Sequence, residues 1–478
     1  MITVAIIGAG PAGLAAAYEL LSQSDEYHIT IFEKDASVGG LSKTFEFEGG
    51  RIDIGGHRFY TKNLNILNLW ENILPKSDQG MLTRDRKSHI LWNSKLIDYP
   101  IKLNVQTIQA LGAIEGAQVV MSYLYSKCIG KEIDNLEDFY VDRFGKKLYS
   151  IFFRDYTRKL WGKPANKLSP DWGSQRIQNI SLSEVFRSLF RKNKQQDERS
   201  FISQYCYPAY GAGQFWEAMA NQILKMGGYI EMNCSVNHLH MDDSHILSVE
   251  YKVQEQSINK SFDYVISSMP LSDLIMAIEN SPVEIKEIGS KLHYRDMIIV
   301  GIDLPRESTG RMFYNVQKDS WLYMQDTAMT FDRIQILNNW SPYAVKTNDH
   351  ILLELEYFCD KGDALWNEDD TLLIKKALGG LIRCGICSSD AAISSYIVKR
   401  IEKAYPVYSD GYSQLSTVEE WINGIENLRC IGRNGQHRYN NMDHSVETGL
   451  AAARSILNEN YNRKLIWNVN TNKEYLER

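Results

Sequence analysis

The beginning of the chain alternates short apolar runs with glycine-rich turns. Residues 4–7 and 28–32 are apolar runs of strand length, which predict two buried parallel strands. Residues 14–21 are rich in alanine and leucine and predict the helix between them. Residues 44–48 and 51–54 flank a pair of glycines and predict a hairpin. The pattern therefore indicates an α/β fold that opens with a strand–helix–strand unit.

The spacing of apolar residues then becomes helical and later returns to that of strands. Apolar residues between 105 and 189 recur at helical intervals, whereas strand patterns dominate residues 298–357. Residues 428–458 predict a last strand followed by a helix. The expected domains are a discontinuous nucleotide-binding domain (1–62, 204–283 and 411–458), a helical insertion (103–203), a second sheet domain (63–102 and 284–410) and a C-terminal tail (459–478).

Composition and charge exclude several functions. At 478 residues the chain is longer than a single core supports, and 44% apolar residues are typical of a globular protein. The net charge of −6 argues against nucleic acid as a partner. No uncharged apolar stretch reaches the roughly 18 residues of a membrane span, and the apolar start lacks the basic residues of a signal peptide. Seven scattered cysteines predict a cytoplasmic protein, and their single CxxC pair predicts no metal site.

The first helix begins with glycines at the spacing of a dinucleotide site. Gly8 provides the tight turn, Gly10 lets the backbone approach a pyrophosphate, and Gly13 permits close packing of helix against strand. The helix N-terminus adds unpaired N–H groups and the positive end of its dipole. Glu33 ends the second strand, where a carboxylate accepts hydrogen bonds from ribose hydroxyls. Together these features predict a bound dinucleotide, which the glycine pattern alone does not.

Two further glycine pairs and a late helix start extend the predicted site. Gly39-Gly40 and Gly55-Gly56 remove side chains where backbone can lie against phosphates or a flat ring. His57 follows the second pair and is either a site residue or an ordinary loop histidine. Residues 442–445 open a helix whose free amides are expected to face a negative or carbonyl-like group.

The order of these motifs resembles that of the glutathione-reductase-like FAD proteins, in the branch that holds amine oxidases, protoporphyrinogen oxidase and UDP-galactopyranose mutase. The resemblance covers about residues 1–457 and implies a Rossmann-like FAD-binding domain, a helical insertion and an antiparallel-sheet substrate domain. Several stretches are similar to the mutases in particular. They are residues 53–57, Tyr99-Pro100, residues 154–161, Arg176, residues 321–323, residues 333–343, Tyr405-Pro406 and residues 432–445.

The glycine motifs and the resemblance assign roles to three groups of residues. Catalytic roles are implied for His57, whose backbone lies at flavin N5 in the mutases, and for Arg176 and Arg333 as ligands of the substrate diphosphate. Substrate contacts are implied for Tyr99, Trp161, Trp321, Tyr323, Tyr405, Tyr439 and Asn441. Cofactor contacts are expected from Gly8, Gly10, Pro11, Ala12, Gly13, Glu33, Lys34, Gly39, Gly40, Leu41, Ser42, Gly55, Gly56, His57, Val236, Gly432, Arg433, Met442, Asp443 and Ser445.

The activity that the resemblance implies is the interconversion of pyranose and furanose forms of a nucleoside-diphosphate sugar through N5 of reduced FAD, in polysaccharide or glycoconjugate precursor synthesis. The cofactor supplies the covalent chemistry, so the protein must mainly hold a departing diphosphate. Arginines suit this task because the guanidinium group stays charged and pairs bidentately with phosphate. NAD(P)H is the candidate external reductant.

Other interpretations of these residues stay open. An isolated arginine is more often a surface ion-pair partner, and a tyrosine is more often a packing residue. The loop after Tyr99-Pro100 reads Ile-Lys-Leu and the segment after Tyr439 is short for a larger mutase, which leaves the base and the sugar open. The main alternative function is an FAD-dependent oxidoreductase of the amine oxidase or protoporphyrinogen oxidase type, which takes a hydride from an organic substrate. A non-catalytic FAD-binding protein is the second alternative.

Overall fold

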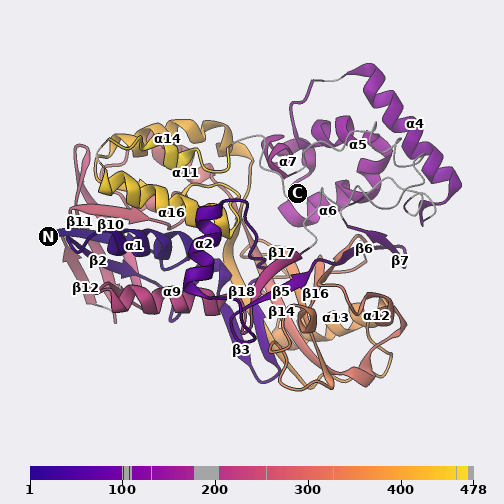
Figure 1. Cartoon of the computed structure of the whole chain (residues 1–478). Helices are drawn as coiled ribbons and strands as arrows, with labels where there is room; N and C mark the ends of the chain where they lie inside the picture. Colours follow the sequence, from indigo (N-terminus) through magenta and orange to yellow (C-terminus); the bar gives the residue numbers. More distant parts are fainter. Residues whose placement is uncertain are drawn as a thin grey trace.

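The computed structural model describes residues 1–99, 101, 107, 110–130, 132–176, 204–254, 256–326, 328–458 and 460–471, except for the side chains of Gln175 and Arg176. Figure 1 shows an α/β region around β1 and α1, a second region around β14 and β17, and a group of helices that includes α4 to α7. None of the described helices is long and apolar enough to cross a membrane.

The α/β region is built on a five-stranded sheet of order β19-β13-β1-β2-β9, in which every pairing is parallel. The last four residues of β1 and of β2 are all buried, which is why apolar runs marked both strands in the sequence. The strands are β1 (Ile2–Ile7), β2 (Tyr27–Phe32), β9 (Tyr229–Glu231), β13 (Tyr264–Ser267) and β19 (Leu428–Cys430).

Helix α1 (Pro11–Gln23) follows β1 and packs against α9 (Gly213–Lys225) and α16 (Met442–Leu457). Gly449 permits the close contact between α1 and α16, because a Cβ there would lie 2.2 Å from the Ala12 carbonyl oxygen. The early helix and the last long helix of the chain therefore meet beside one sheet (Figure 1). The remaining helices of this region are α2 (Leu64–Ile73), α10 (Leu271–Ala277), α11 (Val283–Lys291), α14 (Leu415–Gly424), α15 (Gly432–Gly435) and α17 (Lys464–Trp467).

The segment after α16 is docked on this region. Trp467 is buried, and Nη1 of Arg438 donates to the carbonyl oxygens of Trp467 and, at 3.1 Å, of Val469. Three small antiparallel sheets complete the strands outside the large sheets. They are β3 (Thr44–Phe47) with β4 (Gly50–Asp53), β5 (Met81–Asp85) with β8 (Gln204–Pro208), and β10 (Cys234–Asp242), β11 (His245–Val253) and β12 (Gln256–Lys260).

The second large sheet has seven strands in the order β18-β14-β17-β16-β15-β6-β7, and all its pairings are antiparallel except that of β15 with β6. Strand β18 is not apparent in the sequence pattern, because most of its residues are only half-buried. The strands are β6 (Ser88–Trp92), β7 (Lys95–Asp98), β14 (Tyr294–Pro305), β15 (Trp321–Met324), β16 (Arg333–Ile336), β17 (His350–Cys359) and β18 (Ser395–Pro406).

The two faces of this sheet have different neighbours. Leu353, Leu355 and Tyr357 of β17 pack into a core that also holds buried residues of α13 (Asp370–Arg383). Because side chains alternate along a strand, Glu354 and Glu356 point to the opposite face. That face carries the candidate site. The remaining elements outside the helical group are helix α12 (Arg311–Val316) and short 3₁₀ turns at η1 (Gly40–Ser42), η4 (Arg306–Ser308), η5 (Leu337–Asn339) and η6 (Asp410–Gln414). The 3₁₀ turn η2 (Ala165–Lys167) lies within the helical group, between α6 and α7.

The helical group comprises α4 (Ala113–Ile129), α5 (Leu136–Phe152), α6 (Arg154–Trp161) and α7 (Asp171–Arg176). Gly145 interrupts α5 with a φ of 77°, and a Cβ there would lie 2.7 Å from the Tyr123 backbone nitrogen. Residues 102–106 and 177–203, which belong to the predicted insertion 103–203 or adjoin it, lie outside the described residues.

Candidate active site

A cavity of about 1090 Å³ lies at the carboxyl ends of β1 and β2. Five of the predicted cofactor residues do not line this cavity: Gly13, Gly39, Gly55, Gly56 and Asp443. Of these, Gly56 lines an adjoining cavity. The predicted residues that do line it are Gly8, Gly10, Pro11, Ala12, Glu33, Lys34, Gly40, Leu41, Ser42, His57, Val236, Gly432, Arg433, Met442 and Ser445.

The glycines shape this cleft through their backbone. Gly8 has a φ of +99°, and a Cβ on Gly13 would lie 2.0 Å from the Gly8 carbonyl oxygen, so α1 can start directly behind the turn only without that side chain. The second glycine loop packs on the first, since Gly39 N–H donates to the Ala9 carbonyl at 2.9 Å. A Cβ on Gly40 would lie 3.1 Å from Cα of Gly10.

Glu33 stands at the end of β2 and is 5% exposed. Its two oxygens accept hydrogen bonds from the N–H groups of Ala9 at 2.7 Å and Asp35 at 2.9 Å. Burial raises the pKa of Glu33, and these backbone donors act in the opposite direction. Each oxygen keeps a lone pair for a further donor, as recognition of ribose hydroxyls requires. The cleft volume, the tight glycine turn, the N-terminus of α1 and Glu33 together fit a dinucleotide such as FAD.

A smaller cavity of about 140 Å³ adjoins this cleft. Both are lined by His57, Arg433 and Asn441, together with Leu41, Ile54 and Met442, so they adjoin each other. Every predicted substrate residue except Trp161 lines the smaller cavity. Trp161 is buried behind it, with its ring centroid 6.3 Å from those of Tyr405 and Tyr439.

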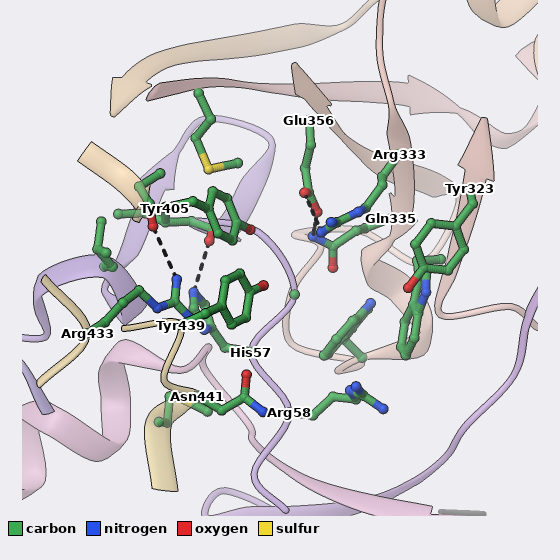
Figure 2. Close-up of a pocket in the computed structure, with 18 of the residues that line it drawn as sticks. His57, Arg58, Tyr323, Arg333, Gln335, Glu356, Tyr405, Arg433, Tyr439 and Asn441 are labelled. Carbon is green, nitrogen blue, oxygen red and sulfur yellow. Dashed lines mark hydrogen bonds and ion pairs between the residues drawn. The ribbon is translucent and has the colours of Figure 1, made fainter. Parts of the chain in front are cut away.

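Arg333 of β16 is the cationic residue at the sheet side of this cavity (Figure 2). Its Nη1 lies 3.0 Å from Oε2 of Glu356, and its Nε donates to the Tyr156 hydroxyl at 3.1 Å. Its guanidinium carbon lies 5.6 Å from the Tyr323 ring centroid. Within the described part of the chain, Nη2 has no hydrogen-bond partner. Burial is the largest single effect and opposes the charged form, but Glu356 together with three neighbouring tyrosines outweighs it and raises the pKa of Arg333 well above its ordinary value.

Buried polar groups beneath Arg333 connect the sheet to the glycine loop. Nε2 of Gln335 donates to Glu354 at 2.8 Å and to Glu356 at 3.0 Å. Gly55 N–H donates to Oε1 of Glu354 at 3.1 Å. Burial and the neighbouring Glu356 raise the pKa of Glu354 well above its ordinary value, which favours its neutral form. The position of the Gly55-Gly56 loop therefore depends on β17.

His57 lies where the two cavities join. Its Nε2 carries the proton, because it is 2.9 Å from the Ile54 carbonyl oxygen, which can only accept. Burial, with the nearby Arg433 charge, lowers the pKa of His57 to about 4. At neutral pH this imidazole is therefore uncharged and cannot act as an acid catalyst through a second proton.

Arg433 and two tyrosines form the opposite wall. Arg433 donates to the carbonyl oxygens of Asn440 at 2.7 Å and Ala404 at 3.2 Å. Its guanidinium carbon lies 5.3 Å from the Tyr405 ring centroid and 4.9 Å from that of Tyr439. The two rings stack at 5.4 Å with an interplanar angle of 19°. Figure 2 shows this wall facing Arg333 across the cavity.

The predicted partner of Arg333 cannot be placed. Arg176 is the last residue of α7, and its side chain lies outside the described residues. The expectation that the two guanidinium groups meet over one ligand thus stays a prediction. Tyr99 does reach the cavity, with its ring centroid 4.2 Å from that of Tyr323, while Pro100 lies outside the described residues.

Sequence reasoning missed five polar or aromatic residues that line the smaller cavity: Arg58, Tyr60, Gln335, Trp340 and Glu356. Arg58 directly follows His57 and Tyr60 lies three residues after it, so both belong to the segment that the Gly55-Gly56 motif already marks. Glu356 had a clearer signal, because Glu354 and Glu356 interrupt an otherwise apolar strand at alternate positions. Two acidic residues on one face of a buried strand indicate a polar site on that face.

Comparison with known protein families assigns the chain to one of them. Residues 11–457 match the model of the flavin-containing amine oxidoreductase family, so the chain belongs to that family. The family resemblance and the α/β fold class expected from the sequence are confirmed.

Solved structures support the same fold. Reduced UDP-galactopyranose mutase superposes with a TM-score of 0.83 at 22% identity, over 98% of this chain and 96% of that one. A putative protoporphyrinogen oxidase from Exiguobacterium superposes with a TM-score of 0.71 at 17% identity, over 95% of this chain and 98% of that one.

Curated relatives include oxidases, desaturases and a probable mutase. Coproporphyrinogen III oxidase of Staphylococcus aureus is 24% identical over 304 residues, which are 56% of this chain and 60% of the relative. A probable UDP-galactopyranose mutase of Klebsiella pneumoniae is 26% identical over 175 residues, 34% of this chain and 42% of the relative. The chain thus matches 60% or less of the length of these two relatives.

Proposed function

We propose that this chain is a flavin-dependent mutase that interconverts the pyranose and furanose forms of a nucleoside-diphosphate sugar, for polysaccharide or glycoconjugate precursor synthesis. The observation that carries the proposal is Arg333, a half-buried and permanently charged group in the small cavity that adjoins the cofactor cleft at His57. Its free Nη2 edge can pair with a phosphate oxygen.

The charge balance of the small cavity supports an anionic substrate. The guanidinium groups of Arg58, Arg333 and Arg433 line it, against the single carboxylate of Glu356. His57 adds no charge at neutral pH, because its pKa is lowered to about 4. An excess of positive charge inside a narrow, partly buried cavity attracts a diphosphate and disfavours a neutral apolar molecule.

Reduced FAD, when bound, supplies the nucleophile for the anomeric carbon. The residues of the chain bind and orient the substrate beside it. Arg333 holds the diphosphate as it departs, and Tyr156 and Glu356 fix the guanidinium in place. Burial raises the pKa of Tyr405, so its phenol stays protonated and can donate to phosphate or sugar oxygens. His57 stays neutral, and its Nε2–H holds the loop to Ile54.

The second candidate function is an FAD-dependent oxidoreductase that takes a hydride from an organic substrate. The curated oxidase relatives, such as coproporphyrinogen III oxidase of Staphylococcus aureus, support it. The aromatic lining of the small cavity supports it too, since rings can enclose a largely apolar substrate. These rings are Tyr60, Tyr99, Trp321, Tyr323, Trp340, Tyr405 and Tyr439.

The experiment that separates the two candidates follows the flavin during turnover. The purified protein is reduced without oxygen by dithionite or NAD(P)H, and UDP- and dTDP-sugars are added. A mutase interconverts the ring forms while the flavin stays reduced, and the oxidised protein serves as an inactive control. Reduction of oxidised flavin by an added substrate, with no isomerisation by the reduced protein, would contradict the mutase and support the oxidoreductase.

A further inference from the structure

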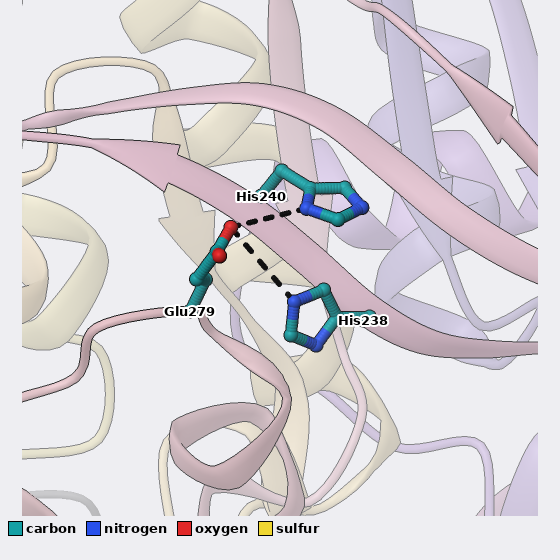
Figure 3. A group of neighbouring side chains, drawn as sticks. All are labelled: His238, His240 and Glu279. Carbon is teal, nitrogen blue, oxygen red and sulfur yellow. Dashed lines mark hydrogen bonds and ion pairs between the residues drawn. The ribbon is translucent and has the colours of Figure 1, made fainter.

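Two histidines and a glutamate converge on one face of the small sheet formed by β10, β11 and β12 (Figure 3). His238 and His240 are two residues apart on β10, so their side chains leave the strand on the same side. Oε2 of Glu279 lies 3.0 Å from Nδ1 of His240 and 3.9 Å from Nε2 of His238. One possible ligand atom from each residue lies within 4.8 Å of those from the other two.

The backbone holds these three residues together. Glu279 N–H donates to the Leu239 carbonyl at 2.9 Å, next to a parallel bridge between Leu239 and Ile278. The register of β10 against β11 shifts just before His238 and just after His240. Such irregularities re-aim side chains and are typical of functional sites. The imidazoles and the carboxylate are therefore attached to two segments that are hydrogen-bonded to each other.

We propose that His238, His240 and Glu279 bind a divalent transition metal ion of the Zn²⁺ class. Imidazole nitrogen and carboxylate oxygen bind Zn²⁺ at about 2.0–2.2 Å, which separates neighbouring ligand atoms of a tetrahedral site by roughly 3.3–3.5 Å. The observed separations of 3.0 and 3.9 Å from the Glu279 oxygen lie on either side of that value. Mg²⁺ and Ca²⁺ are excluded as preferred ions because they select oxygen ligands.

Glu250 supplies the carboxylate that a metal-bound imidazole needs on its other nitrogen. Oε2 of Glu250 lies 3.6 Å from Nε2 of His240, on the opposite side of the ring from Glu279. Carboxylates in this position orient metal-bound imidazoles and raise their basicity. The side chains of His238, His240 and Glu279 are 37%, 31% and 44% exposed, which leaves a path for the ion to enter.

The site adjoins the wall of the cofactor cleft. Val236 and Asn237 line the cleft immediately before His238, and Met276 and Ala277 line it just before Glu279. A metal ion that ties β10 to the segment after α10 would brace this wall. Zn²⁺ is therefore expected to raise the melting temperature of the FAD-loaded protein, because it binds the folded chain and not the unfolded one.

The test measures Zn²⁺ and Co²⁺ on the full-length flavoprotein after treatment with a chelator. The wild type is expected to retain a single Zn²⁺ per chain after dialysis, and Co²⁺ is expected to give the visible absorption of a site with nitrogen ligands. His240→Ala and Glu279→Gln should weaken Zn²⁺ binding by at least ~10-fold, the smaller loss seen when even an orienting partner is removed. Excess Mg²⁺ should not compete.

The matched control is His245→Ala. His245 is a half-exposed histidine of β11, and its Nδ1 lies 3.8 Å from Oε2 of Glu426. Among the described residues, it belongs to no group of three or more possible metal ligands. This variant should bind Zn²⁺ as the wild type does. Equal Zn²⁺ binding by the wild type and His240→Ala, or an equal loss in His245→Ala, would overturn the proposal that these three residues form the metal site. FAD content, measured for each variant, confirms that the fold is retained.

Discussion

The cofactor cleft and the small cavity share a wall at His57 but are built in different ways. Backbone shapes the cleft, through the turn at Gly8, the packing of Gly13 and the loop at Gly39-Gly40. The small cavity is formed by large polar side chains from the second sheet and from the segments around α15 and α16. A backbone surface suits a cofactor that a whole family shares, whereas side chains select the substrate. Substitution of a glycine should therefore impair cofactor binding in the cleft, whereas substitution of a single charged residue should impair the function of the cavity.

The largest expected effect is on Arg333. Arg333→Met removes a fixed positive charge from the cavity, and loss of one such donor typically costs ~2.7–4 kcal/mol of transition-state stabilisation, or about 10²–10³ in rate. Isomerisation by the reduced protein should fall by that factor, while FAD content stays unchanged because Arg333 does not line the cleft. Turnover and flavin absorbance are measured on the same samples.

A second variant separates this catalytic effect from folding. Arg333→Met leaves the buried Glu356 carboxylate unpaired, which costs about 3–5 kcal/mol of stability. The double variant Arg333→Met/Glu356→Gln removes both charges and should recover most of the melting temperature without recovering activity. Activity within tenfold of the wild type in either variant would refute the assigned role of Arg333.

The stability of the protein should depend on pH through His57, which lies between the cleft and the small cavity. The pKa of His57 is lowered to about 4 from an ordinary value of 6.5, mainly by burial, so the unfolded chain binds this proton more readily than the folded one. Stability therefore falls as pH drops from 6.5 towards 4, by at most about 3 kcal/mol for a pKa difference of this size.

The measurement compares the melting temperatures of the wild type and His57→Asn across this pH range. The variant lacks the titrating ring, so the difference between the two proteins should shift in favour of the variant at low pH. Parallel curves from pH 7 to 4 would mean that His57 is fully solvated and not the half-buried imidazole between the two cavities.

The difference between cleft and cavity also explains what the sequence could predict. The strand–helix–strand unit was predictable because β1, α1 and β2 follow one another within residues 2–33. Its glycines are explained by local backbone geometry, such as the positive φ of Gly8 and the close contact of Gly13 with the Gly8 carbonyl. Arg333, Tyr405 and Tyr439 were identified only through family resemblance, since nothing local distinguishes them from surface or packing residues. Their meeting depends on pairings between strands that are far apart in the chain.

The ion pair of Arg333 with Glu356 and the burial of its neighbours could not be predicted from the sequence. Glu356 lies 23 residues after Arg333, and only the antiparallel register of β16 with β17 sets them side by side. Gln335 and Glu354 are brought to the Gly55 loop by the same register. Strand β18 was missed because its half-buried residues have no clear alternation, although it carries Tyr405 to the cavity.

A moderate effect is expected in the cleft itself. Gly13→Ala would place a Cβ 2.0 Å from the Gly8 carbonyl oxygen, so the turn must move away from the cofactor phosphates. Overpacking of this kind typically costs ~1–3 kcal/mol, and FAD content should fall with it. The control is Gly379→Ala within α13, where a Cβ meets nothing within 4 Å. That change should stabilise the helix by ~0.5–1 kcal/mol and leave FAD bound. Wild-type FAD content in Gly13→Ala would contradict a backbone-built cleft.

The smallest expected effect separates two neighbouring residues that were both predicted to contact the cofactor. Glu33 is buried and held by two backbone N–H groups, whereas Lys34 lines the same cleft with an exposed side chain. Because an exposed charge contributes at most about 1 kcal/mol, Lys34→Ala should weaken FAD binding by less than ~5-fold. Glu33→Gln should weaken it more, since a neutral amide replaces a carboxylate that holds the Ala9 turn. Fluorescence titration of the apoproteins with FAD measures both, and an equal loss in the two variants would mean that charge near the ribose, not the buried hydrogen bonds, governs binding at this end of the cleft.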